Sequence, residues 1–357
     1  MAEPTPPTTT PRRPRFGVDC AATVFPYPPG VQRVVAELCA HLSHMEKVEC
    51  IPLRPHTQMT ERRWRHRELP RLEKERGLDG ILSFTSAFPI AGKGLRIQTI
   101  HELPWLNGEA ENAGFGHKLW ARHGWRRASQ IIVPSNHVFA DLEDFSPRAA
   151  ARAHVIAWAV GDLFRDTVEA PPDLAIPAAP FFLAVGATRS KKRLDNAIHG
   201  LAAESTHAPH LLVTGSPSPA AEQSKQLSRS LGLQDRVHFL GHLDDASLAA
   251  LYHLAQGCLL LAPSEGFGFP ALEALAAGIP VLCPAQTAQA ELAGESTYFV
   301  DPTRPKSIAN AMRIAIAEAG TGGAALLRAQ RQKRAGEFTW ERTALALEDV
   351  LLRALRG

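Results

Sequence analysis

The sequence predicts an α/β protein of two domains, with parallel sheets that face each other across a cleft. Short apolar runs alternate with helical patterns in both halves of the chain, which is typical of parallel sheets covered by helices. The length of 357 residues suggests about two domains. A stretch rich in Pro, Ala and acidic residues separates the halves, and we interpret residues 166–180 as the linker. Both domains are therefore expected to be Rossmann-like.

The apolar runs define the predicted strands and the domain boundaries. In the first half the strands are expected at residues 16–21, 48–53, 80–84, 95–101, 130–134 and 154–158. In the second half they are expected at residues 181–185, 211–214, 236–240, 257–261, 280–283 and 296–300. These series predict an N-terminal domain at 15–165, a C-terminal domain at 181–338 and a helix at 339–357 that crosses back to the N-terminal domain. Ligands of such sheets bind at the carboxyl ends of the strands.

Composition and charge limit the classes of partner. A formal net charge of +3 is too small to indicate a nucleic-acid partner, and it is compatible with a local basic site for an anionic ligand. The sequence has no apolar run of 18 residues that would predict a transmembrane helix. Residues 1–14 are expected to be a disordered leader rather than a secretory signal, because they lack an apolar core. The five cysteines form no C-x-x-C pair, so we expect free thiols, no metal site and a cytoplasmic location.

The most informative segment is residues 264–281, SEGFGFPALEALAAGIPV. Glu265 and Glu273 stand eight positions apart around the turn Gly266-Phe267-Gly268-Phe269, and a helical pattern follows. A loop that enters a helix in this way presents free N–H groups and the positive end of the helix dipole to an anion. The two carboxylates could therefore bind two parts of one extended ligand. The alternative is a capping glutamate and a solvent-facing one.

This segment closely resembles the E-x7-E signature of retaining glycosyltransferases of family 4 (glycosyl transferases group 1), which have the GT-B fold. The resemblance implies that Glu265 hydrogen-bonds hydroxyls of the donor sugar and that Glu273 holds the ribose of the nucleotide. It also implies that the backbone amides of Gly266, Phe267, Gly268 and Phe269 approach the sugar and its phosphate, which glycine permits.

A second segment, GATRSKKRLD at residues 186–195, places several cations between a predicted strand and a predicted helix. Cations at this position suit a pyrophosphate. The segment resembles the diphosphate-binding segment of the family, in which Lys192 occupies the place of the lysine. Lys191 stands where arginine or glutamate is usual, so this position departs from the family pattern. The alternative is a solvated basic loop.

Three segments of the N-terminal half also resemble the family. His101 directly follows a predicted strand, and its segment is similar to Ile-His-Asp-Leu with Glu102 in place of the aspartate. The resemblance implies that His101 lies against the reacting sugar; the alternative is a structural histidine at a strand end. Gly30 is similar to the glycine of Gly-Ile-x-Arg-Tyr, which implies close approach to the donor. Ser135 or Asn136 is expected to be the N-cap of the next helix.

Basic and aromatic residues cluster in two segments, which comprise Arg62, Arg63, Trp64, Arg65 and Arg67, and Lys118, Trp120, Arg122, Trp125, Arg126 and Arg127. A basic amphipathic helix can lie on an anionic membrane surface. It can equally be a solvated face with packed indoles, and we favour this interpretation. Peripheral contact with an anionic membrane is the competing hypothesis.

Together the motifs predict a retaining glycosyltransferase of GT-B architecture. It would move a hexose-type sugar from a nucleotide diphosphate sugar to a hydroxyl acceptor, a glycan, a lipid-linked molecule or a small molecule, in glycan, polysaccharide or glycolipid biosynthesis. The donor is a co-substrate, and no cofactor or metal is expected. His101, Lys192 and Glu265 are the predicted catalytic residues, and Gly30, Lys191 and Glu273 join them as donor-binding residues. The alternatives are a catalytically inactive GT-B-like scaffold subunit and a nucleotide-sugar epimerase.

Overall fold

The computed structural model describes residues 12–85, 87, 89–106, 124–171 and 174–357. Each half of the chain forms a six-stranded parallel sheet, which confirms the predicted fold class. The N-terminal sheet has the order β2-β1-β3-β4-β5-β6. Its strands are β1 (Arg15–Asp19), β2 (Glu49–Leu53), β3 (Gly80–Ser83), β4 (Leu95–Thr99), β5 (Gln130–Val133) and β6 (Ala153–Val155).

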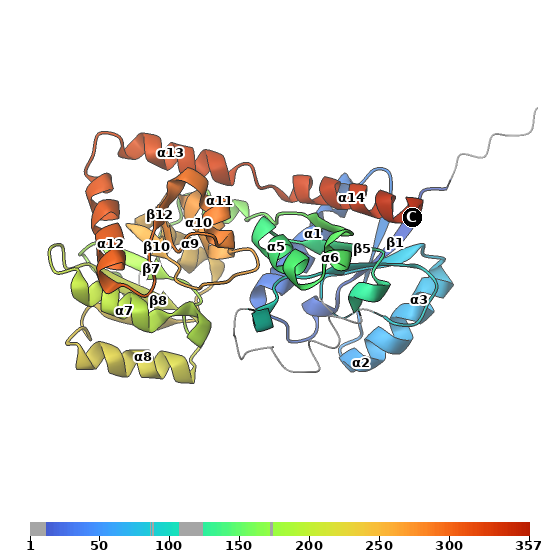
Figure 1. Ribbon diagram of the computed structural model, residues 1–357, viewed down its shortest axis with the longest axis horizontal. Helices are drawn as coiled ribbons and strands as arrows, with labels where there is room; N and C mark the ends of the chain where they lie inside the picture. The colour runs from blue at the N-terminus through green and yellow to red at the C-terminus, as the bar shows by residue number, and fades with distance from the viewer. Residues whose placement is uncertain (1–11, 86, 88, 107–123, 172–173) are drawn as a thin grey trace, which may run out of the picture.

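The C-terminal sheet has the order β12-β11-β10-β7-β8-β9. Its strands are β7 (Phe181–Ala184), β8 (His210–Thr214), β9 (Val237–Gly241), β10 (Gly257–Leu259), β11 (Val281–Cys283) and β12 (Thr297–Phe299). Strands β3, β7 and β11 are mostly apolar and buried along their whole length, as expected when helices cover both faces of a sheet. The two sheets form separate lobes in Figure 1.

Helices cover the two sheets. Those of the N-terminal half are α1 (Pro29–His41), α2 (Glu61–Arg63), a π-helical turn (Trp64–Glu68), α3 (Leu69–Arg76), α5 (Asn136–Phe145) and α6 (Pro147–Ala150). Those that follow are α7 (Leu194–Ala203), α8 (Pro219–Ser230), α9 (Asp245–Leu254), α10 (Phe269–Ala277), α11 (Ala288–Ala293), α12 (Pro305–Ala319), α13 (Ala324–Ala335) and α14 (Trp340–Arg356). Helix α1 begins at Pro29, because proline fits the first helical position.

Helix α14 leaves the C-terminal lobe and lies along the N-terminal lobe (Figure 1). It packs against α1 and β4. The Thr343 hydroxyl donates to the carbonyl of Ala157 at 2.8 Å, and Glu348 accepts from the backbone N–H of Lys47 and of Val48. The apolar face of α14 is thereby part of the same core as α1.

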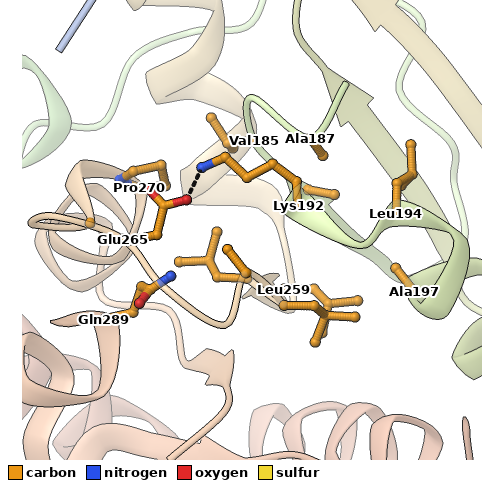
Figure 2. Close-up of a pocket in the computed structure, with 14 residues that line it drawn as sticks. Val185, Ala187, Lys192, Leu194, Ala197, Leu259, Glu265, Pro270 and Gln289 are labelled. Atoms are coloured by element: carbon orange, nitrogen blue, oxygen red, sulfur yellow. Dashed lines mark ion pairs between the residues drawn. The ribbon is translucent and has the colours of Figure 1, made fainter. Parts of the chain in front are cut away.

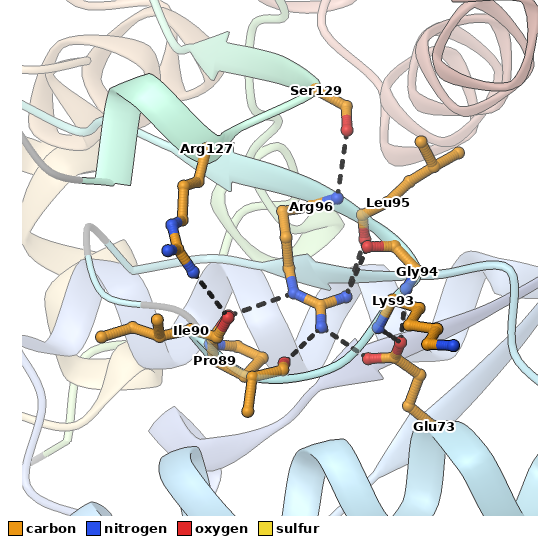
Figure 3. Close-up of polar contacts among 10 residues, drawn as sticks. Glu73, Pro89, Ile90, Lys93, Gly94, Leu95, Arg96, Arg127 and Ser129 are labelled. Atoms are coloured by element: carbon orange, nitrogen blue, oxygen red, sulfur yellow. Dashed lines mark hydrogen bonds and ion pairs between the residues drawn. The ribbon is translucent and has the colours of Figure 1, made fainter.

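A buried ion pair holds the loop between β3 and β4 (Figure 3). Arg96 and Glu73 are 2.6 Å apart, and both side chains are only 6% exposed. Arg96 also donates to the carbonyls of Pro89, Ala91 and Gly94, whereas Glu73 accepts from the N–H of Gly94. Charge-assisted hydrogen bonds therefore satisfy both buried groups and fix the loop at the start of β4.

The indoles of Trp64 and Trp125, one from each basic segment, are packed inside the protein. Trp64 and Trp125 are 2% and 3% exposed, which supports a solvated face with packed indoles. Lys118, Trp120 and Arg122 lie outside the described residues. Among the residues that are described, no helix is long and apolar enough to cross a membrane. Peripheral membrane contact stays a prediction.

Candidate functional site

Glu265 and Lys192 meet at the carboxyl end of the C-terminal sheet. Glu265 lies in the loop between β10 and α10, and Lys192 lies in the turn between β7 and α7. Their charged groups are 2.6 Å apart, and both side chains are largely buried. Burial alone would raise the pKa of Glu265, but Lys192 and Lys191 together lower it below the ordinary value of 4.5. The carboxylate is therefore ionised at neutral pH.

Lys191 points the other way, across the domain boundary. Its ammonium group is 2.8 Å from the carboxylate of Glu102 in the N-terminal domain. The two positions that depart from the family pattern are thus in contact with each other, and their charges are opposite. This pair joins the basic turn after β7 to the loop after β4, so it links the two domains directly.

Glu273 is also held by a residue of the other domain. Its carboxylate is 3% exposed, and it accepts hydrogen bonds from the Arg33 guanidinium and from the Tyr252 hydroxyl. Arg33 also contacts Asp245 at 3.0 Å, and it lies over the ring of Phe269. Burial raises the pKa of Glu273 even though Arg33 opposes this shift. The carboxylate predicted to hold the ribose therefore anchors α1 of the N-terminal domain.

Gly266 makes the closest approach between the two domains. A Cβ atom at this position would lie 2.8 Å from the carbonyl carbon of His101, which is closer than real Cβ atoms come to backbone. The Ser135 hydroxyl donates to the Gly266 carbonyl at 2.7 Å. The sequence predicted that Gly266 approaches the donor, and the structure shows in addition that it approaches the backbone of His101. Only glycine allows this contact.

Ser135 and Glu291 bind the start of α5. The Ser135 hydroxyl accepts from the N–H of Val138, which confirms the predicted N-cap. Glu291, in α11 of the other domain, accepts from the N–H of Asn136 and of His137. Because free N–H groups at a helix start favour a negative charge, Glu291 stabilises this contact between the domains.

The His101 ring is fixed by the carbonyl of Phe84, which is 2.7 Å from Nε2. A carbonyl only accepts, so Nε2 carries the proton and Nδ1 is the acceptor of the neutral ring. Burial lowers the pKa of His101 below its ordinary value of 6.5, although the bond to Phe84 opposes this shift. The imidazole is therefore neutral at pH 7.

Two of the predicted glycines have positions that explain the residue type. Gly268 has φ +98° and directly precedes α10, in a backbone conformation that favours glycine. Gly30 lies in the first turn of α1, where an added Cβ would touch the Phe269 ring at 3.5 Å. The predicted donor-binding residues thus lie together, on the loop before α10, on the turn after β7 and on the facing ends of the N-terminal domain.

A small pocket opens beside Lys192 and Glu265 (Figure 2). The ends of β7 and β10 form its apolar wall, and Gly268, Pro270 and Gln289 complete it. Its volume is about 10 Å³, which is room for about one water molecule. Within the described ranges, no three His, Cys, Asp or Glu side chains gather closely enough to hold a metal ion.

Sequence reasoning missed several residues of this site. Arg33 lies three residues after Gly30, in the segment that resembles the family, but the sequence predicted no role for it. Neither Tyr252 nor Gln289 was identified from the sequence. The opposite charges of Lys191 and Glu102, both departures from the family pattern, were a signal that could have predicted their contact. No comparable signal marked Tyr252, which directly follows the apolar run 248–251 of α9.

The architecture is the GT-B fold of glycosyltransferases, and solved structures share it. The chain superposes on sucrose-phosphate synthase from Thermosynechococcus elongatus with a TM-score of 0.73, over 96% of this chain and 99% of that one, at 21% identity. It superposes on Anabaena HepE in complex with UDP-glucose with a TM-score of 0.74, over 95% and 99%, at 14% identity.

Residues 169–335 match the family described as glycosyl transferases group 1, and the C-terminal domain of the chain belongs to this family. The chain is 32% identical over 248 residues to D-inositol 3-phosphate glycosyltransferase of Geodermatophilus obscurus, which is 67% of this chain and 50% of that protein. It is 33% identical over 123 residues to glycogen synthase of Mycobacterium tuberculosis, which is 34% of this chain and 30% of that protein. The chain thus spans about half or less of the length of these curated relatives.

Proposed function

We propose that the protein is a retaining glycosyltransferase that moves a hexose-type sugar from a nucleotide diphosphate sugar to a hydroxyl acceptor. The observation that carries this proposal is the Lys192–Glu265 pair at the entrance of α10. A cation for the diphosphate and a carboxylate for the sugar hydroxyls stand side by side and neutralise each other. A nucleotide sugar carries both a diphosphate for Lys192 and sugar hydroxyls for Glu265. It can therefore replace the ion pair between the two side chains by one contact to each of them.

The charges of the site suggest how the reaction proceeds. As the bond to the sugar breaks, negative charge develops on the leaving diphosphate, and Lys192 with the start of α10 stabilises it. In this front-face route a phosphate oxygen of the donor takes the proton of the acceptor hydroxyl. A double displacement is not favoured, because the Glu265 carboxylate is paired with Lys192 and the carboxylate of Glu102, on the facing loop, is paired with Lys191. The acceptor is a glycan, a lipid-linked molecule or a small molecule.

Two similar proteins support the choice of donor. The solved structure of HepE, which shares the fold at 14% identity, is a complex with UDP-glucose. The similar protein from Geodermatophilus obscurus is a D-inositol 3-phosphate glycosyltransferase. We therefore expect a nucleoside diphosphate to bind at the carboxyl end of the C-terminal sheet.

The first test is thermal unfolding with a panel of nucleoside diphosphates and nucleotide sugars. A ligand at a hundred times its dissociation constant stabilises the folded state by about 2.7 kcal/mol. We expect one nucleotide and its sugar to raise the melting temperature, and the Glu273→Ala variant to lose this shift. If no compound of the panel raises the melting temperature of the folded protein, a catalytically inactive scaffold becomes the better description of its function.

Lys192→Ala is expected to lower kcat by about 10²–10³-fold, because it removes a cation that stabilises the developing charge. Glu273→Ala is expected to act mainly on donor binding, since this carboxylate is predicted to hold the ribose. Steady-state kinetics with varied donor separate the two effects. Lys306→Ala, on the exposed face of α12, is the matched control. Equal turnover of Lys192→Ala and the parent would contradict the assignment of Lys192 to the diphosphate.

Activity is expected to fall at acidic pH, because protonation of His101 would put a positive charge beside a sugar that itself becomes positive. The pKa of His101 is lowered by burial, so the decline begins below the ordinary histidine range rather than within it. The measurement is kcat/KM between pH 5 and 8, a range of about three units around the ordinary histidine pKa. A His101→Gln variant, which cannot titrate there, should lack this decline; if it retains the decline, another group is responsible.

A further inference from the structure

We propose that the side-chain amide of Gln289 hydrogen-bonds a hydroxyl of the transferred sugar and thereby selects which nucleotide hexose is accepted. This inference rests on the proposed function, and it adds a residue that determines donor specificity. Neither the glutamate motif nor the basic segment contains Gln289, which lies in the second position of the short helix α11.

The first observation is the buried side-chain oxygen of Gln289. Gln289 is 1% exposed, and its Oε1 atom has no hydrogen-bond partner among the described residues. Leaving a buried polar group unpaired costs roughly 1–3 kcal/mol, so such groups in folded proteins call for a specific explanation. A ligand hydroxyl that completes the hydrogen bond is such an explanation.

The second observation is where the amide lies. Gln289 lines the same pocket as Glu265 and Lys192, and Figure 2 shows its amide on the same side of the pocket as the Glu265 carboxylate. Its Cγ atom would be 3.1 Å from a Cβ at Gly268, so the side chain packs directly against the turn before α10. The amide therefore has little freedom to turn away from the pocket.

The helix that presents Gln289 is fixed at its start. The Thr287 hydroxyl accepts from the N–H of Ala290 and donates to the carbonyl of Pro284. Glu291, on the same helix, contacts the start of α5 in the other domain. Because α11 is held at both sides, closure of the two domains fixes the position of the Gln289 amide.

The chemistry of the amide suits a sugar hydroxyl. A hydroxyl donates one hydrogen bond and accepts others, and the glutamine amide offers both an acceptor and donors without a charge. The predicted ligand of the ribose, Glu273, does not line this pocket, whereas the predicted ligand of the sugar, Glu265, does. We therefore assign Gln289 to the sugar rather than to the nucleotide.

The test compares binding of UDP with binding of UDP-glucose by isothermal titration, or of the nucleotide pair that the thermal panel identifies. Gln289→Leu removes the amide at nearly constant volume. We expect the Kd of the nucleotide sugar to rise about tenfold and the Kd of the nucleotide alone to stay unchanged; a tenfold change corresponds to 1.4 kcal/mol. Gln286→Leu is the matched control, because Gln286 is exposed and does not line this pocket.

The outcomes separate this inference from the proposed function. If the parent protein binds neither compound, the proposed function fails. If it binds both and Gln289→Leu weakens both equally or neither, the function stands and the role of Gln289 is wrong. The melting temperature of the ligand-free Gln289→Leu variant should equal or exceed that of the parent, and a lower one would mean that the amide has a structural partner. Gln289→Met serves the same comparison if the leucine variant does not fold.

Discussion

Replacement of Gly266 by alanine is expected to lower sugar transfer by about a hundredfold. The added methyl group would collide with the backbone of His101, and neither backbone can move aside as a flexible side chain could. The domains would therefore stop short of the contact that brings His101 to the loop before α10, and a misplacement of about 1 Å can cost this factor. The measurement is kcat/KM for transfer, or for hydrolysis of the donor before an acceptor is known.

Binding of the nucleotide alone distinguishes this effect from misfolding. The nucleotide is expected to bind mainly to the C-terminal domain, so its Kd should change little in the Gly266→Ala variant. Gly322→Ala is the control, because an alanine there meets open space and the backbone has ordinary φ. Full activity of the Gly266→Ala variant would mean that this close contact between the domains is absent from the active state.

Glu73→Ala is expected to destabilise the N-terminal domain by about 3–5 kcal/mol. The change leaves the Arg96 guanidinium buried without its carboxylate, and removal of one partner of a buried pair typically costs this much. The six tryptophans all lie outside residues 166–338. Their fluorescence during urea unfolding therefore reports the N-terminal domain together with α14.

Two further variants test the origin of this destabilisation. Glu75→Ala removes an exposed carboxylate from the same helix, where an ion pair contributes little, so its midpoint should stay close to that of the parent. Replacing both Glu73 and Arg96 by apolar residues should recover part of the loss, because no buried charge remains unpaired. If the urea midpoint of Glu73→Ala equals that of the parent within error, the Glu73–Arg96 pair does not stabilise the domain.

The strands and helices were predictable because they depend on local patterns. Apolar runs of four to seven residues between turn residues marked the strands. The cluster of Glu265 and Lys192 at one sheet edge followed from the rule that the carboxyl ends of parallel strands meet there. Local sequence and topology together therefore sufficed for the fold and for part of the site.

The partners of the charged groups were not predictable in this way. Arg33 and Glu273 are 240 positions apart, and Lys191 and Glu102 are 89 apart. Their contacts depend on how the two domains sit against each other, which no periodicity encodes. The same holds for Gly266. A side chain is excluded at this position because it lies against the backbone carbonyl of His101 in the other domain.

Helix α14 follows the other described elements in chain order, and this affects when the N-terminal domain can finish folding. Domains commonly fold as units from the N-terminus while the chain is made. Here Leu347, Val350 and Leu351 of α14 belong to the core that contains Val34 and Leu38 of α1. The N-terminal domain can therefore complete its core only after residues 340–356 have left the ribosome, when the C-terminal domain is already whole. Until then, the apolar surface beneath α14 is exposed to solvent.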